Sequence, residues 1–269
     1  MHRWLIAAIA TISAVTFTQT ASAADLPVKA PVAPVAVAPS WTGWYVGLNV
    51  GGNWGTSAIS TTVGNSSTGA FYPPNIVSNI NAIGAPANLN TNGFTGGLQG
   101  GYNYQIGQWL WGVEADFQYF RSAGSNSVTG PIAAFNTVTI TSSISSDWLF
   151  TLRPRLGIIL NNWLFYGTGG LAVSELKANW NWVNTTAGLP ITESASASGV
   201  KAGWIVGGGI ETMLPGKWLI GAEYLYVNFG SISVNSIAIE TGFGPLSNPF
   251  SHTADLSANI VRARLSKLF

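Results

Sequence analysis

Charge is scarce in this chain. Only 8% of its 269 residues are charged, against about 25% in a typical soluble domain, while 47% are hydrophobic. So few charged side chains do not cover a surface that faces water on every side. The composition therefore favours a protein in contact with lipid.

Long apolar runs are also missing. Beyond residue 17 no stretch reaches the 18 or so apolar residues that a transmembrane helix requires. Within a bilayer every backbone polar group must be hydrogen-bonded, which leaves helices and closed β-barrels as the spanning structures. A membrane protein with this sequence must therefore cross the bilayer as strands.

Cysteine is absent, and only two histidines are present. Disulfides and a lipid-anchoring cysteine are thus excluded. A single histidine beyond the first residues, His252, falls short of a transition-metal site, so we expect no metal and no cofactor. The 11 basic and 10 acidic residues nearly balance, which argues against binding to nucleic acid.

The first 40 residues read as export and linker segments. Residues 1–23 combine a basic start at Arg3, an apolar stretch and a final Ala-Ser-Ala, which is typical of a secretory signal peptide. Residues 24–40 contain four prolines, which predict an extended periplasmic linker. The remaining residues, 41–269, form the predicted outer-membrane β-barrel.

Eight segments of the remaining chain alternate with the period of two that is typical of a β-strand. In Trp41–Gly55, even positions such as Trp44 and Leu48 are apolar, whereas odd positions carry tyrosine, glycine and asparagine. The contrast is weakest in Trp163–Ser174, where both faces are fairly apolar. The other segments are Gly93–Tyr104, Trp109–Phe120, Asp147–Ile158, Val200–Met213, Trp218–Asn228 and Ser257–Phe269.

Short and long connections alternate strictly between these segments. The short ones are 105–108, 160–162 and 214–217, and the long ones are 55–92, 121–146, 175–199 and 229–253. This alternation is typical of bacterial outer-membrane barrels, which have tight periplasmic turns and long extracellular loops. The sequence around Trp180 and Trp182 also allows a strand to extend above the membrane.

A soluble β-sandwich or lipocalin-like barrel also alternates, but its outer face carries charge. Here the less apolar face is rich in Gly, Asn, Gln and Thr. Tryptophans near the segment ends are typical of interfacial girdles. These are Trp44, Trp54, Trp109, Trp111, Trp148, Trp204 and Trp218. We therefore predict an all-β, eight-stranded antiparallel transmembrane β-barrel with both ends in the periplasm.

Charged residues of the predicted strands fall almost entirely on the inward face. The four acidic ones are Glu114, Asp116, Glu211 and Glu223, and the four basic ones are Arg153, Arg155, Arg262 and Arg264. Buried charges are tolerable when they are paired and hydrogen-bonded, and an eight-stranded barrel is just wide enough for side chains to fill it. We interpret the set as a charge network that plugs the lumen. The alternative is the charged constriction of a narrow channel.

Two further sequence features do not indicate a phosphate-binding or catalytic site. The clusters GGLQGG, GTGG and GGG lack the following helix that a phosphate-binding loop needs, so we expect their inward glycines to make room for bulky neighbours. Ser251, His252 and Asp255 lie too close together on one strand for a catalytic triad. We interpret His252 as a loop residue and expect no enzyme activity.

Five stretches together resemble a known family. They are WTGWYVGLNVGGNWG, LFYGTGGLAV, GWIVGGGIE, WLIGAEYLYVNFG and NIVRARLSKLF. They are similar to the small eight-stranded outer-membrane proteins of alphaproteobacteria, the RopB-type surface proteins also called "porin family" or "OmpA-like β-barrel" proteins. The resemblance implies an outer-membrane location, no catalytic residues, and a role in envelope integrity and host contact.

The resemblance also implies partners. Outer-membrane lipid and lipopolysaccharide would surround the barrel, and the terminal aromatic, Phe269, would be part of the signal read by the barrel-assembly machinery. Lys267 departs from the family, which usually has an aromatic or aliphatic residue there; we expect its ammonium to reach the periplasmic interface. From its length alone, segment 55–92 is the first candidate for contact with a host or surface ligand. A small channel for ions or solutes is the alternative function.

Overall fold

The computed structural model describes residues 40–65, 72–133, 136–185, 191–240 and 244–269. The predicted signal peptide and all but the last residue of the predicted linker lie outside these ranges. Among the described residues, no helix is long and apolar enough to span a membrane.

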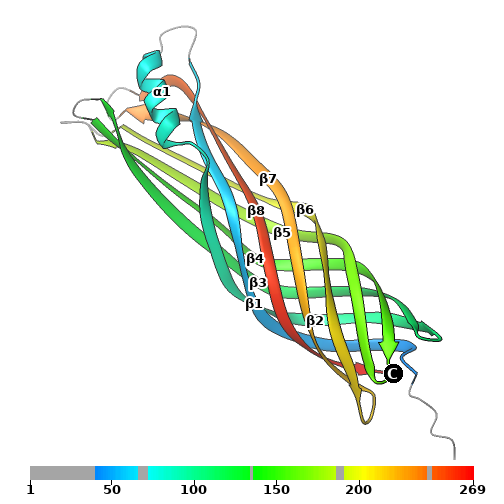
Figure 1. Ribbon diagram of the computed structural model, residues 1–269. Helices are drawn as coiled ribbons and strands as arrows, with labels where there is room; N and C mark the ends of the chain where they lie inside the picture. Colours follow the sequence, from blue (N-terminus) through cyan, green and yellow to red (C-terminus); the bar gives the residue numbers. More distant parts are fainter. Residues whose placement is uncertain (1–39, 66–71, 134–135, 186–190, 241–243) are drawn as a thin grey trace, which may run out of the picture. The chain divides into compact units, whose positions relative to one another are not determined.

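Eight antiparallel strands close into a barrel in sequence order (Figure 1). β1 and β8 close the ring, with Tyr45 opposite Leu268 at one end and Val63 opposite Phe250 at the other. The predicted fold class is thus confirmed. The strands are β1 (Gly43–Val63), β2 (Ala87–Ile106), β3 (Trp109–Ala133), β4 (Asn136–Leu160), β5 (Trp163–Thr185), β6 (Ile191–Leu214), β7 (Trp218–Glu240) and β8 (Gly244–Leu268).

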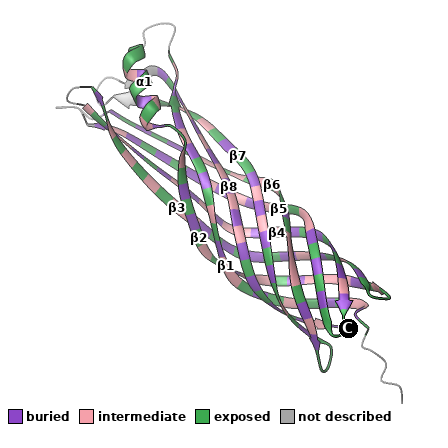
Figure 2. Cartoon of the chain, in the orientation of Figure 1, coloured by how far each residue is buried: buried purple, intermediate pink, exposed green. Residues whose placement is uncertain are grey.

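The end of the barrel that holds the C-terminus carries an outward-facing apolar belt. Exposed and buried residues alternate along each strand there (Figure 2), and the exposed ones are large and apolar, as in Leu48, Leu98 and Val261. A band of this kind suits lipid on the outside. Tight turns join the strands at this end, and glycines with positive φ serve two of them, Gly107 at 61° and Gly216 at 76°.

The strands continue far beyond this belt, which corrects the predicted loops. Segments 121–146, 175–199 and 229–253 are mostly strand, and β3 and β4 are separated only by residues 134–135. Ser and Thr alternate there with the inward residues Val138, Ile140 and Ile144. The period of two is that of a strand, but the low hydrophobicity of these segments made it hard to recognise in the sequence. The polarity is the reverse of the belt, because the apolar residues point inward and the polar residues face water.

Among the described residues, three apolar clusters and a layer of charged side chains occupy the interior. Near the C-terminal end, Trp41, Leu110 and Leu219 belong to the first cluster. Beyond the charged layer, the long strand extensions bury a second cluster that includes Phe120, Leu149 and Leu225. A third, with Trp182 and Phe250, lies further along the extensions. Side chains therefore fill the interior in successive layers.

In the described part of segment 55–92, the helix α1 (Pro74–Ile83) is the one element that is not strand extension. It lies at the end of the barrel away from the C-terminus (Figure 1) and buries Val77 and Ile80 in the third cluster. Asn81 binds the backbone of Val63 on β1 in both directions, accepting at 2.7 Å and donating at 3.1 Å. Asn79 donates to the carbonyl oxygen of Ile132 on β3 at 3.0 Å. The helix thus fills the space between β1 and β3 beyond the start of β2.

Candidate functional site: a charge network in the lumen

The eight charged residues predicted for the inward face all point into the lumen and are nearly inaccessible to solvent. Their exposed fractions lie between 0% for Arg153 and 3% for Arg264. The structure brings all eight into one network of ion pairs. They come from β3, β4, β6, β7 and β8, because inward positions recur every second residue along each strand.

Two acid and base pairs face each other directly across neighbouring strands. Glu114 of β3 is the register partner of Arg153 of β4, and their charged atoms are 2.6 Å apart. Glu223 of β7 is the register partner of Arg262 of β8, at 2.7 Å. β3 and β4 lie on the opposite side of the ring from β7 and β8. Each wall of the barrel therefore supplies one locally balanced pair.

Further contacts join the two walls across the lumen. Nη1 of Arg153 lies 3.2 Å from Oε1 of Glu223, and Nη2 of Arg262 lies 3.0 Å from Oδ2 of Asp116. Arg264 of β8 also binds Glu114 of β3. Removing a charge from water is costly unless several partners satisfy it, and these cross-lumen contacts provide them. These contacts join the two walls, while Oδ1 of Asp116 and Nε of Arg155 have no hydrogen-bond partner among the described residues.

Arg155 and Glu211 extend the network toward the C-terminal end. Nη2 of Arg155 donates to Oε2 of Glu211 at 2.9 Å. The guanidinium of Arg155 also lies over the ring of Tyr166, 4.0 Å from its centroid. A cation placed over an aromatic ring is attracted to it, so both Glu211 and the ring of Tyr166 hold this arginine.

Two tyrosines belong to the network but were not singled out from the sequence. Tyr45 donates to Oε2 of Glu114 at 2.6 Å, and Tyr166 donates to Oε1 of Glu223 at 3.0 Å. Tyr45 alternates in step with the inward glycines and asparagines of β1, so its inward direction was predictable from the sequence. Tyr166 lies on β5, where both faces are fairly apolar, so the alternation of residues did not indicate which side chains point inward.

Two glycines of the clusters make room for these tyrosines. A Cβ atom at Gly101 would lie 2.6 Å from Oη of Tyr45, and one at Gly209 would lie 2.5 Å from Oη of Tyr166. Contacts that short are not tolerated. An alanine at either position would therefore push a tyrosine out of the network.

The seven predicted interfacial tryptophans lie on the outer face near the two edges of the belt. Trp148 is half-buried, stacked on Phe117 with centroids 5.9 Å apart, and the other six are exposed. Trp54, Trp148 and Trp204 lie at the edge next to the strand extensions, which we call the upper rim. The remaining four, Trp44, Trp109, Trp111 and Trp218, lie near the tight turns.

Cations lie outside the lumen at both edges. At the upper rim, Lys177 binds Oδ2 of Asp147 at 2.8 Å, and this hydrogen bond raises the pKa of Lys177 above its usual value. Arg121 lies 3.7 Å from the same carboxylate. At the other edge Lys267 donates to the carbonyl oxygen of Gly216 and lies over the ring of Trp218. Its ammonium therefore reaches the periplasmic turn.

His252 is not a loop residue, and that prediction was wrong. It lies within β8, fully buried among apolar side chains, with its ring 5.3 Å from that of Trp180. It contacts Oε1 of Glu193 at 3.2 Å, Oγ of Ser236 at 3.1 Å and Oγ1 of Thr61 at 2.9 Å. The reason is again the reversed polarity of the extensions, which turns position 252 inward.

The neighbours of His252 do not complete a triad. Ser251 and Asp255 have the opposite parity on β8, and Oδ1 of Asp255 accepts the backbone amide of Ala58 at 2.5 Å. Within the described ranges, no group of three or more His, Cys, Asp or Glu side chains is placed to hold a metal ion. The histidine thus belongs to a polar cluster inside an apolar interior.

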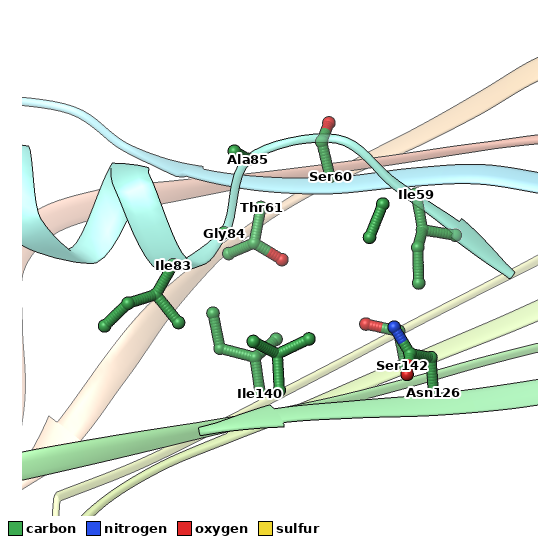
Figure 3. A pocket seen from close by; sticks show the side chains of 11 residues that line it. Ile59, Ser60, Thr61, Ile83, Gly84, Ala85, Asn126, Ile140 and Ser142 are labelled. Carbon is green, nitrogen blue, oxygen red and sulfur yellow. The ribbon is translucent and has the colours of Figure 1, made fainter. Parts of the chain in front are cut away.

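One small cavity lies between the end of α1 and the strands. Its volume is about 20 Å³, roughly enough for one water molecule. Figure 3 shows Ile83 at the end of the helix, Ile59 and Thr61 of β1, and Ile140 of β4 around it. A cavity of this size cannot bind a solute.

A closed eight-stranded barrel with an apolar belt and a polar lumen defines the class of integral outer-membrane β-barrels. Residues 10–244 match the outer membrane protein beta-barrel domain family. The chain belongs to this family, and the outer membrane is its location.

Named relatives come from alphaproteobacteria. The 31 kDa outer-membrane immunogenic protein of Brucella melitensis is 34% identical over 82% of this chain and 86% of its own length. The 22 kDa outer membrane protein of Rhizobium leguminosarum is 27% identical over 74% and 69%. Among solved structures, the outer membrane protease OmpT of Escherichia coli aligns with a TM-score of 0.42 and 9% identity over 84% of this chain and 97% of that one. A TM-score of this size supports no statement about activity.

Proposed function

We propose that this protein is a closed barrel with a structural and surface-contact role, and that the charge network plugs its lumen. The observation that carries the proposal is the balance of four buried acids and four buried bases, each paired across the lumen or along it. A water-filled channel would instead leave such side chains partly hydrated. No catalytic residue is needed for this role, and we propose none.

The apolar clusters on both sides of the network support the same proposal. An ion would have to pass the layer around Leu110 and Leu219, then the charges, then the layer around Phe120 and Leu225. Apolar constrictions of a pore exclude water and ions. Conduction would therefore require the interior to rearrange at three levels.

The proposed partners follow from position. Lipid surrounds the belt, and lipopolysaccharide would meet the upper rim, where Arg121 and Lys177 face outward with Asp147. The assembly machinery would read the C-terminal strand that ends in Phe269. The outer end, with α1 and the strand connections of segment 55–92, would present the contact surface for a host or surface ligand.

Planar-bilayer recording tests the plug against the alternative of a small channel. We expect purified protein to give no stable open steps. Steps that Arg153→Ala abolishes or resizes, and that Arg121→Ala outside the lumen leaves unchanged, would overturn the plug and establish the channel.

For the proposal of no enzyme activity, the test residue is His252. Hydrolytic activity of purified protein that is lost in His252→Ala while the barrel stays folded would contradict it.

A further inference from the structure

The wall of the barrel is interrupted between β6 and β7. These strands pair from Leu214 opposite Trp218 up to Trp204 opposite Asn228, and pairing resumes only at Thr192 opposite Ile239. Between these points, residues 193–203 of β6 and 229–238 of β7 have no register partners in each other. We call this stretch the β6–β7 seam.

The two edges of the seam remain regular strands, because each is still paired on its other side. β6 pairs with β5 without interruption from Trp204 to Ile191, and β7 pairs with β8 from Ser231 to Ile237. In antiparallel strands, alternate residues direct their N–H and C=O groups to alternate neighbours. About half of the backbone groups in each segment therefore point into the seam.

Side chains do not close the middle of the seam, although at its lower end a Cβ atom at Gly203 would lie 2.8 Å from Cα of Phe229. A Cβ atom added at Gly199 on β6 or at Gly230 on β7 would have no heavy atom within 4 Å. Val200 is 65% exposed although it is apolar. The middle of the seam thus combines free space with an exposed apolar side chain.

The position of the seam makes it accessible from outside the cell. Its lower end is the upper rim, where the rings of Trp204 and Tyr226 pack 5.4 Å apart. Near its upper end His252 contacts both Glu193 of β6 and Ser236 of β7, so the two edges are linked from the inside. The seam lies beyond the belt that faces lipid, on the side where the strand extensions face water.

A second gap, between β1 and β3 in another part of the ring, is filled by a segment of the chain itself. Between β1 and β3, beyond the start of β2, the helix α1 occupies the space, and the amide of Asn81 binds both backbone groups of Val63. In the seam, no such segment is found in the part of the chain that the structure describes. Unpaired strand edges are templates for pairing with another extended chain.

We propose that the β6–β7 seam binds an extended polypeptide segment of a partner protein by β-strand addition. Main-chain hydrogen bonds would provide affinity, and alternate side chains would provide specificity. Phe229 and Ile232 line the interior behind the seam, so the bound segment has apolar residues at every second position and polar residues facing water. This inference rests on the surface-contact role proposed above.

Hydrogen exchange of the full mature protein in detergent micelles is the first test. We expect alternate amides in 193–203 and 229–238 to exchange about a hundredfold faster than those of 205–213 in the same strand. The probe is a synthetic peptide of residues 229–238, FGSISVNSIA, in which Ile232, Val234 and Ala238 lie on one face. We expect it to slow exchange in 193–203, and its version N-methylated at alternate residues to have no effect.

Cross-linking provides a matched control, since the chain has no cysteine of its own. The same peptide with a terminal cysteine should form a disulfide with Gly199→Cys and not with Asn179→Cys, which is exposed on β5 and paired with both β4 and β6.

Three results would overturn the inference. They are slow exchange of both segments in the free protein, equal effects of the plain and N-methylated peptides, or protection by added phospholipid vesicles without peptide, which would assign the seam to lipid. The test is independent of the lumen. A conducting barrel with a peptide-binding seam would refute only the plug, whereas a sealed barrel with a protected seam would refute only this inference.

Discussion

Arg153 on β4 meets Glu223 on β7 across the lumen, with 3.2 Å between Nη1 and Oε1. The same arginine binds Glu114 and Asp116 on the adjacent strand at 2.6 and 2.8 Å. One guanidinium therefore connects three carboxylates from two walls. Its removal would leave three buried charges short of a partner.

Arg153→Ala should lower the free energy of unfolding by about 3–5 kcal/mol, the usual loss when one member of a buried ion pair is removed. The measurement is urea-induced unfolding of the barrel in lipid vesicles, followed by tryptophan fluorescence. Arg121→Ala is the matched control, because its carboxylate partner is 3.7 Å away and both side chains are exposed; we expect less than about 1 kcal/mol there. Equal losses in the two variants would contradict the network.

Replacing His252 tests the polar cluster inside the apolar extension. Phenylalanine keeps the ring packed near Trp180 and Phe250 but removes the partner of buried Glu193. We expect His252→Phe to cost roughly 1–3 kcal/mol in the same unfolding assay. Adding Glu193→Leu should recover most of this loss, because both polar groups are then gone; losses that simply add would show that the two residues are uncoupled.

Asn81 should hold α1 in place without supporting the barrel. Its side chain makes two hydrogen bonds to Val63, each worth about 1 kcal/mol. We predict that Asn81→Ala speeds amide exchange in 74–83 by roughly tenfold or more, while the shift in gel mobility between boiled and unboiled barrel stays unchanged. Asn75→Ala, exposed on the same helix, should change neither. Unaltered exchange in Asn81→Ala would show that burial of Val77 and Ile80 suffices.

The C-terminal aromatic should matter for assembly. The backbone amide of Phe269 donates to the carbonyl oxygen of Trp44 at 2.9 Å, and its ring is 65% exposed. Deleting Phe269 removes the bond and the ring, whereas Phe269→Ala removes the ring alone. We expect both to reduce the amount of heat-modifiable barrel in the outer membrane, and Phe269→Tyr to preserve it. Wild-type amounts of folded barrel in both the deletion variant and Phe269→Ala would refute a role of this residue in assembly.

The belt and the charged layer were predictable from the sequence. Lipid contact requires an apolar residue at every second position, as in Trp44, Val46 and Leu48, and this is a local property of each strand. The same parity placed Glu114 and Arg153 inward. Which acid meets which base depends on register and ring closure, and these arise from pairings between residues far apart in the chain.

The strand extensions were harder to predict because their pattern is the reverse of the belt's, with apolar residues inside and polar residues outside. Ser143 faces water and Ile144 faces the interior, so a search for lipid-facing strands interprets the stretch as loop. His252 was misplaced for the same reason. The helix α1 was also not predicted from the sequence, because a helix of ten residues is stabilised mainly by tertiary packing.

By itself, the sequence determined that this chain crosses the outer membrane as alternating strands and carries balanced charges on their inner face, because both properties are set residue by residue. Only the tertiary structure decided that the charges form one network, that the strands continue as an apolar-filled extension, and that β6 and β7 separate above the upper rim. Those features depend on how distant strands pair, which no local pattern encodes.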